Sequence, residues 1–376
     1  MITLLPYLNK MEKSKNIKPF KILLLYFILF SFITTCKSTG NKGEKLTVNN
    51  LVVLNNNTLS LEVLPSVGGR IVSVKRNGGK NILKSDRKLW NYKFTDPVDK
   101  RIYNNIIPFN GHIIWVGPQN EWWSRQNILQ DLHDKKAVWP PDPYLIYGSY
   151  EILEQGNDYL KLLGPASKYT GVSLTKTIIL NSGKIIVKAE AKNTWQKPIA
   201  WDLWFNTRLD GFSKVYVPVA DEKDIRVEYM EGNNEMPYKI ENGYFFFNTT
   251  VSVLQKKRRA GKAFIYPSAN KIFAFTDSEM FIIHFEKYDR KLIHPAQGMV
   301  EIYNSVDSKK DALMELEYHT PYQTINPEES IAGKEIWEVV EYRNGNSSNE
   351  QIDFINIYMG LTKNGNSENL YAENYK

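Results

Sequence analysis

Short segments in which apolar and polar residues alternate recur along this chain from Leu46 onward, and they restrict the folds that it can adopt. In residues 59–64, Leu59, Leu61 and Val63 alternate with Ser60 and Glu62. Successive side chains of a strand point to opposite faces, so this pattern predicts a strand with one buried face. Many such segments, separated by Asn, Gly and Pro, predict an all-β fold: a large antiparallel β-supersandwich with few helices.

Two local patterns refine this prediction. Asn181-Ser182-Gly183 separates the alternating segments 175–180 and 184–191, which is typical of a β-hairpin. Convincing amphipathic helices are scarce, and only residues 126–135 suggest one short helix.

Composition excludes several classes of function. Of 376 residues, 42% are hydrophobic and 24% charged, which is typical of a packed globular body. Residues 1–35 hold five lysines and one acid, so they supply more than half of the net charge of +7, and no nucleic-acid partner is expected. Cys36 is the only cysteine, which rules out an intrachain disulfide and a Cys-based zinc site. No phosphate loop, nucleophile elbow or paired histidine motif is evident, so neither a metal nor a cofactor is expected.

The N-terminal residues resemble a bacterial lipoprotein signal. A basic segment precedes the apolar run at 22–33, and Ile33-Thr34-Thr35 precedes Cys36, the predicted lipidation site. An ordinary signal peptide or an uncleaved anchor is the alternative. We predict a signal peptide at 1–35, a flexible tether at 36–44, a single β-supersandwich domain at 45–361 and a flexible tail at 362–376. The expected location is the bacterial cell envelope, with the chain lipid-anchored to a membrane.

Residues 110–143 form a long segment that fits neither a helix nor a strand as a whole. It holds four of the nine tryptophans, at positions 115, 122, 123 and 139, interleaved with polar residues such as Gln119 and Asp142. Long irregular segments in compact domains are usually functional or disordered, and aromatic residues argue against disorder. We predict a loop that lines a cleft. The alternative is that the tryptophans plug one end of the sandwich.

Alternation also sorts the side chains of three predicted strands. In residues 200–208 it places Asp202, Trp204, Asn206 and Arg208 opposite an apolar face, as a cleft floor or a solvated outer face. Residues 313–319 place Glu315, Glu317 and His319 on one face, and 299–303 place Glu301 with Tyr303. Carboxylates beside aromatic walls lose solvation, which raises their pKa toward values useful for a general base. The alternative is that these glutamates are surface charges.

Three groups of residues carry a family resemblance. The opening at 59–78, with Gly68-Gly69-Arg70-Ile71, resembles the galactose mutarotase-like (aldose 1-epimerase) superfamily. Gly111-His112, Ile114-Trp115, Gly117-Pro118-Gln119 and Trp139-Pro140-Pro141-Asp142-Pro143 resemble its DUF4380 branch. The closing segments 315–321, 326–330 and 335–337 also fit, so the resemblance spans about residues 46–345.

The resemblance implies a carbohydrate cleft on one concave sheet. It also implies acid–base chemistry by a glutamate and a histidine. Glu317 best matches the glutamate strand of the superfamily, and Glu301 is the second choice. No histidine occupies 202–206, where the superfamily has one, so His112 is the candidate acid.

Three functions follow from this resemblance. The first is sugar binding without chemistry, by a monomer whose partners are a carbohydrate and, through the lipid anchor, a membrane. An aldose epimerase and a glycoside hydrolase or lyase are the alternatives, so enzymatic activity stays open. The residues predicted to bind the sugar are Arg70, Trp115, Gln119, Trp122, Trp139, Asp142, Trp204 and Asn206.

Overall fold

The computed structural model describes residues 51–103, 106–229, 234–249, 258–276, 278–307 and 311–361. These residues fall within one compact unit. The predicted signal peptide, Cys36, the tether and the C-terminal tail lie outside them. None of the helices in the described part of the chain has the length and apolar content that a bilayer crossing requires.

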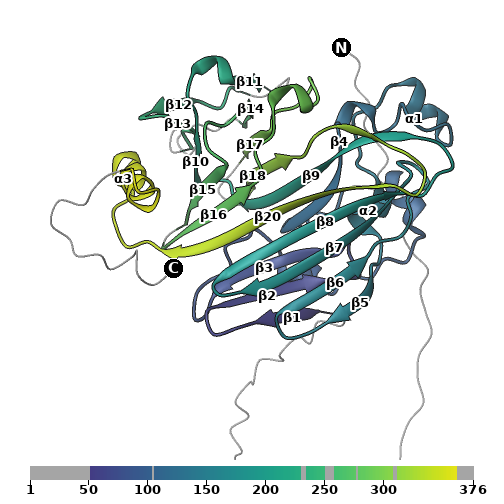
Figure 1. The fold of residues 1–376 in the computed structure, drawn as a ribbon, viewed down its shortest axis with the longest axis horizontal. Helices are drawn as coiled ribbons and strands as arrows, with labels where there is room; N and C mark the ends of the chain where they lie inside the picture. Colours follow the sequence, from purple (N-terminus) through teal and green to yellow (C-terminus); the bar gives the residue numbers. More distant parts are fainter. Residues whose placement is uncertain are drawn as a thin grey trace, which may run out of the picture. The chain divides into compact units, whose positions relative to one another are not determined.

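Two antiparallel sheets of ten strands each make up the described body, which confirms the predicted all-β fold. The first sheet runs in the order β1 (Val52–Asn55), β2 (Leu59–Leu64), β3 (Arg70–Arg76), β4 (His112–Gly117), β9 (Ile199–Asp210), β18 (Ala312–His319), β17 (Val300–Val306), β14 (Arg259–Ile265) and β11 (Ile225–Tyr229), and β19 (Gln323–Ile325) pairs with β9. The second runs in the order β12 (Tyr238–Glu241), β13 (Tyr244–Phe247), β10 (Lys214–Pro218), β15 (Lys271–Phe275), β16 (Glu279–Phe285), β20 (Ser330–Glu341), β8 (Lys184–Asn193), β7 (Val172–Asn181), β6 (Tyr159–Leu163) and β5 (Glu151–Gln155). Figure 1 shows β5, β6, β7, β8, β20 and β16 side by side.

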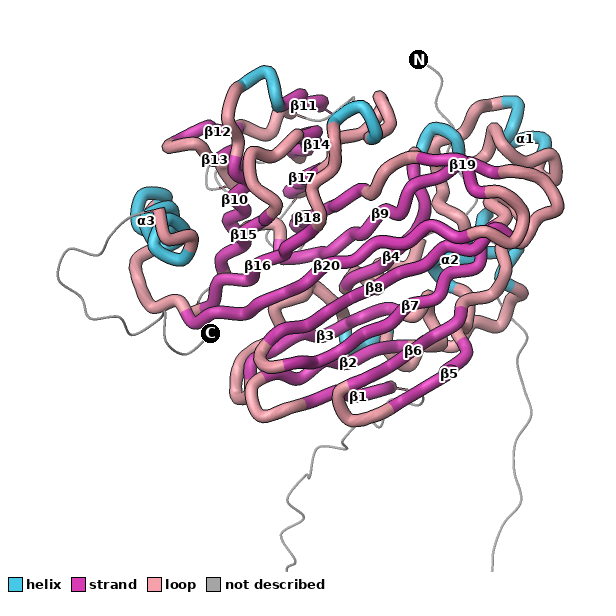
Figure 2. The backbone as a smooth tube through the Cα atoms, viewed as in Figure 1, coloured by secondary structure: helices cyan, strands magenta, loops and turns pink. Residues whose placement is uncertain are grey.

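Helices are few and short among the described residues (Figure 2). They are α1 (Gln130–Asp134), α2 (Pro143–Tyr147), α3 (Ser348–Tyr358) and the 3-10 turns η1 (Arg87–Leu89), η2 (Val98–Tyr103), η3 (Gln119–Glu121), η4 (Glu222–Asp224) and η6 (Arg290–Leu292). The helix expected at 126–135 is shorter than predicted, because the Gln126 side chain accepts hydrogen bonds from the backbone N–H groups of Ile128 and Leu129, each at 2.7 Å. This local turn competes with helical hydrogen bonding, and the helix begins only at Gln130.

The inner faces of the two sheets pack against each other, as expected from the alternation. The ring of His112 on β4 lies 4.8 Å from that of Trp337 on β20. Tyr318 on β18 stacks on Phe285 of β16, also at 4.8 Å between ring centroids. These contacts join one sheet to the other, so the core lies between them.

The predicted hairpin is present between β7 and β8, where Asn181 pairs with Lys184. Ser182 and Gly183 both have positive φ angles, 46° and 80°, as the favoured two-residue hairpin turn requires.

Strand register brings polar residues of the first sheet together on its outer face. Trp201, Leu203 and Phe205 of β9 are buried in the core, and the alternate positions face outward. Asn206 pairs with Glu317 of β18, which in turn pairs with Glu301 of β17. Three distant parts of the sequence thus place an amide and two carboxyl groups in one row.

Candidate functional site

A pocket of about 430 Å³ lies on the outer face of the first sheet. Its floor includes Trp204 of β9, Glu301 of β17 and Lys262 of β14. One wall comes from residues 110–143, the aromatic segment, through Pro118, Gln119, Asn120 and Val138. Other walls come from β11 and from residues 295–297. The aromatic segment and the C-terminal acidic strands therefore share a pocket.

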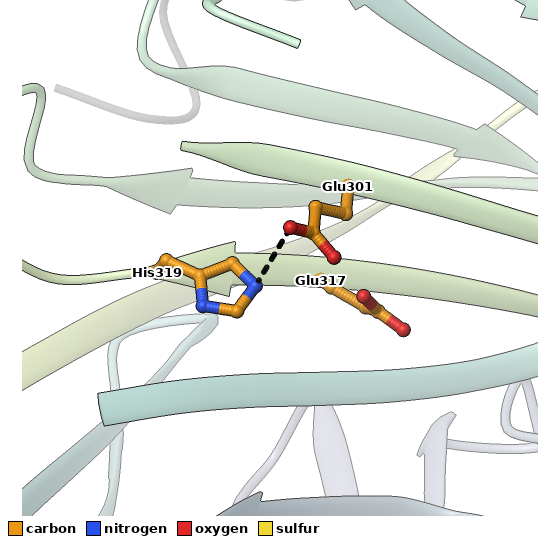
Figure 3. A group of neighbouring side chains, drawn as sticks. All are labelled: Glu301, Glu317 and His319. Atoms are coloured by element: carbon orange, nitrogen blue, oxygen red, sulfur yellow. Dashed lines mark ion pairs between the residues drawn. The ribbon is translucent and has the colours of Figure 1, made fainter. Parts of the chain in front are cut away.

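A cluster of alternating charges lies at and beneath the floor. The Lys262 Nζ atom lies 2.5 Å from Glu301 Oε2 and 2.9 Å from Glu317 Oε2. His319 contacts Glu301 through Nε2 at 3.5 Å (Figure 3) and Asp202 through Nδ1 at 3.0 Å. Both glutamates, His319 and Asp202 are buried, so each charge is balanced by a neighbour of opposite sign rather than by water.

The two glutamates titrate in opposite directions. Burial alone raises the pKa of Glu301, but Lys262 and His319 overcome it and hold that pKa well below its usual value. Burial raises the pKa of Glu317 well above the usual value, and Glu315 and Glu301 add to this effect while Lys262 opposes it. Glu301 is therefore the fixed anion of the pocket, and Glu317 lies behind it as a weakly acidic group.

The basic groups respond to these carboxylates. Burial lowers the pKa of His319, but Glu301 and Asp202 outweigh it and raise that pKa to about 9. Burial likewise lowers the pKa of Lys262, and its two glutamate partners raise it above its ordinary value. Both side chains are therefore cations at neutral pH.

The donor atoms of Glu301, Glu317 and His319 lie within 4.8 Å of one another, a spacing that could hold a metal ion. Carboxylate and imidazole groups are also suitable metal ligands. However, the Lys262 ammonium contacts both carboxylates from within this group. A metal ion would have to displace this ammonium, which already neutralises both carboxylates. The two carboxylates are therefore arranged around the Lys262 ammonium rather than around a metal ion.

Two buried indoles pack against Trp204 of the floor. The ring of Trp204 lies 5.2 Å from that of Trp115 and 5.8 Å from that of Trp122, with the latter pair stacked. The Trp122 Nε1 atom donates to the Val116 carbonyl at 2.6 Å, which holds the segment against the sheet. Trp115 and Trp122 are only 5% and 2% exposed, so they support Trp204 and do not themselves line this pocket. This corrects the expectation that they offer open faces to a ligand.

Arg70 and Asp142, which were predicted to bind the sugar, have structural partners instead. The Arg70 guanidinium donates to the carbonyl oxygens of Asn110 at 2.8 Å and Ile146 at 3.0 Å. Asp142 caps the start of α2 by accepting from the Tyr144 N–H at 2.9 Å. Both side chains are buried, so they stabilise loops and do not line the pocket.

His112 and Trp139 also lie apart from their predicted roles. His112 points into the core between the sheets, where its Nδ1 atom lies 2.9 Å from Thr207 Oγ1, and it cannot act beside Glu301 or Glu317. Burial, together with nearby lysine and arginine residues, holds its pKa well below the ordinary value. Trp139 is 50% exposed and follows Val138 of the pocket wall. Asn206 lies beneath the floor, where its Nδ2 atom donates to Glu317 Oε1 at 3.1 Å.

Sequence reasoning missed three residues of the site. It placed His319 on the correct face but did not select it, and it did not consider Lys262 or Gln297. Alternation in 259–265 carries the signal for Lys262, because Ala263 and Ile265 are buried on the opposite face. The Gln297 Nε2 atom lies 2.8 Å from His319 Nδ1. A Cβ atom at Gly117 would collide with Gln297 and Asp202, so the wall approaches the cluster closely only because residue 117 is a glycine.

Together, the fold and the site define an all-β protein of two packed antiparallel sheets, with a polar pocket and a buried ionic cluster on the outer face of one sheet. The chain belongs to the family described as domain of unknown function DUF4380, whose model matches residues 49–340. This confirms the predicted family.

Solved structures with similar folds share little sequence with this chain. The Slr1438 protein from Synechocystis is 11% identical, with a TM-score of 0.48 over 78% of this chain and 96% of that one. A galactose mutarotase-like protein from Lactobacillus casei is 9% identical, with a TM-score of 0.48 over 78% and 100%. Another from Clostridium acetobutylicum is 10% identical, with a TM-score of 0.46 over 78% and 95%. A comparison with curated proteins finds no match.

Proposed function

We propose that this protein binds an uncharged sugar in the pocket above Lys262 and Glu301. The observation that carries the proposal is this ion pair, fixed at 2.5 Å on the pocket floor beside the ring of Phe264. A sugar presents both hydroxyl groups and apolar C–H faces, so its site needs fixed polar groups next to an aromatic surface.

The floor offers both kinds of contact. The Lys262 ammonium lies over the Trp204 ring, 4.7 Å from its centre, and that indole is only 3% exposed. The aromatic surface that the pocket offers is the partly exposed ring of Phe264, whose centre lies 5.6 Å from the same ammonium. An ammonium has three N–H donors, and two carboxylates occupy two of them. One donor is left for a ligand hydroxyl. The buried partners hold this donor in position, which reduces the entropy lost on binding.

Charge pairing favours a neutral ligand. Among the described residues that line the pocket, each cationic side chain already contacts a carboxylate: Lys262 contacts Glu301, and Arg226 contacts Glu228. A sulfated or phosphorylated sugar would therefore find no unpaired cation there, and Glu301 and Glu228 would repel it.

Acid–base isomerisation is the second candidate, because His319 and Glu301 are adjacent, as a histidine acid and a glutamate base would need to be. The pKa directions oppose it. A general base works best with a pKa near the operating pH, and that of Glu301 is held well below its usual value. The pKa of Glu317 is raised, but Glu317 does not line the pocket.

Hydrolysis fits less well. Two catalytic carboxylates must flank the glycosidic bond with room for the sugar between them. Here the Lys262 ammonium bridges Glu301 and Glu317 and fills the space between their carboxyl groups.

Isothermal titration calorimetry with a panel of neutral, uronic and sulfated saccharides tests the proposal. Neutral sugars should bind and anionic analogues should not. Phe264→Ala should weaken binding at least about tenfold, equivalent to about 1.4 kcal/mol. The control is Lys161→Met, which removes the exposed partner of Glu154 on the second sheet and should leave the affinity unchanged. Binding of anionic sugars alone, or of none, refutes the proposal.

Polarimetry separates the two candidates. Under the binding proposal, the protein should not accelerate the mutarotation of α-glucose or α-galactose. Acceleration that is lost in Glu317→Gln or His319→Gln would favour the isomerase instead.

A further inference from the structure

We infer that the pocket receives an oligosaccharide chain that crosses the strands, rather than a single sugar ring. This inference rests on the proposed function and specifies its ligand. It comes from three features of the pocket: its extent across the sheet, a fixed polar pair at one end and an exposed amide group at the other.

The extent follows from strand order. The lining runs from Trp204 on β9 to Arg226 and Glu228 on β11, with β18, β17 and β14 between those strands. Neighbouring strands are about 4.8 Å apart, so four spacings separate these ends by about 19 Å. This span is longer than one pyranose ring, and contacts at both ends require several linked units.

The β11 end carries polar groups that are already held in place. Arg226 pairs with Glu228 on the same face of the strand, and its guanidinium lies 3.9 Å from the centre of the Phe264 ring. An arginine stacked on an aromatic ring loses less side-chain freedom on binding than a mobile one. This pair can therefore bind hydroxyl groups of a unit beyond the one above Lys262.

The opposite end is formed by the aromatic segment. The Gln119 Nε2 atom donates to the Val138 carbonyl at 2.7 Å, which fixes two lining residues against each other. Trp139 follows Val138 and is half exposed, but it does not line the pocket. The exposed Asn120 side chain does line the pocket, and its amide group can bind hydroxyl groups of a further sugar unit.

The length dependence of affinity tests this inference. Calorimetry with the intact chain would use the mono-, di-, tetra- and hexasaccharides of the maltose, cellobiose and galactose series. For the series that binds, the tetrasaccharide should bind at least about tenfold more tightly than the monosaccharide, since each further unit forms hydrogen bonds of its own.

Two variants locate the added contacts. Arg226→Ala and Asn120→Ala should each reduce the ratio of tetrasaccharide to monosaccharide affinity by at least about threefold. The matched control is Arg343→Ala, because Arg343 forms a similar exposed pair two residues from its partner, Glu341, and does not line the pocket. Thermal unfolding of each variant shows whether it is folded, and either variant alone suffices for the test.

The outcomes distinguish this inference from the proposed function. Equal affinity for all lengths overturns the oligosaccharide inference and leaves sugar binding intact. An increase with length that neither variant reduces also overturns it, because the added units would then bind elsewhere. If no saccharide binds, both proposals fail.

Discussion

Replacing Lys262 by methionine should destabilise the fold much more than removing an ordinary surface lysine. The Lys262 side chain is only 13% exposed, and it is the shared partner of two carboxylates that are almost fully buried. Methionine keeps most of the side-chain volume and removes the charge, so the decrease in unfolding free energy reports the lost ion pairs rather than a cavity.

The expected loss is about 3–5 kcal/mol at neutral pH, the cost of removing one partner from a buried ion pair. The first contributor is Glu301, which loses its 2.5 Å contact and keeps only His319 as a cationic partner. Without the ammonium, the pKa values of Glu301 and Glu317 should both rise, because burial then acts without its main opposing charge. The destabilisation should therefore shrink as the pH falls and these carboxyl groups bind protons.

Urea denaturation, followed by far-UV circular dichroism and tryptophan fluorescence, measures this difference at neutral and mildly acidic pH. The matched control is Lys161→Met, whose 3.4 Å pair with Glu154 is exposed and should contribute about 0–1 kcal/mol. The triple variant Lys262→Met/Glu301→Gln/Glu317→Gln should recover part of the stability, because it removes the unpaired charges. Equal losses for Lys262→Met and Lys161→Met, or a loss that does not depend on pH, would refute this account of the cluster.

Two further predictions concern other parts of the chain. The pKa of His319 is about 9 in the folded protein against an ordinary value of 6.5, so its charge should add about 3 kcal/mol of stability. This stability should be fully present below pH 6.5 and lost as the pH rises through about 9. His319→Gln should flatten this part of a plot of unfolding free energy against pH, and an unchanged slope would count against the assignment. Cys36→Ala should abolish metabolic labelling by a fatty acid and move the protein from the membrane fraction to the soluble one, whereas persistent labelling would contradict the predicted lipid anchor.

The sequence alone determined the class of fold and the sorting of side chains within each strand. Both follow from local periodicity, because neighbouring side chains of a strand must point to opposite faces. Alternation placed Asp202, Trp204 and Asn206 on one face of β9, and Glu317 with His319 on one face of β18, as observed. The aromatic and polar content of residues 110–143 predicted a loop that lines a cleft, and four residues of this segment line the pocket.

Only the tertiary structure decided which of these residues meet. Strand order joins β9, β18, β17 and β14 over long sequence separations, and no local pattern specifies that Lys262 lies between Glu301 and Glu317. Local pattern also could not show that His112 faces the core while His319 contacts the acidic cluster. Alternation places each histidine on one of the two faces of its strand, but it does not say which face is buried against the other sheet. Periodicity fixes the face of a side chain within its own strand, whereas a site depends on the neighbours that pairing and packing supply.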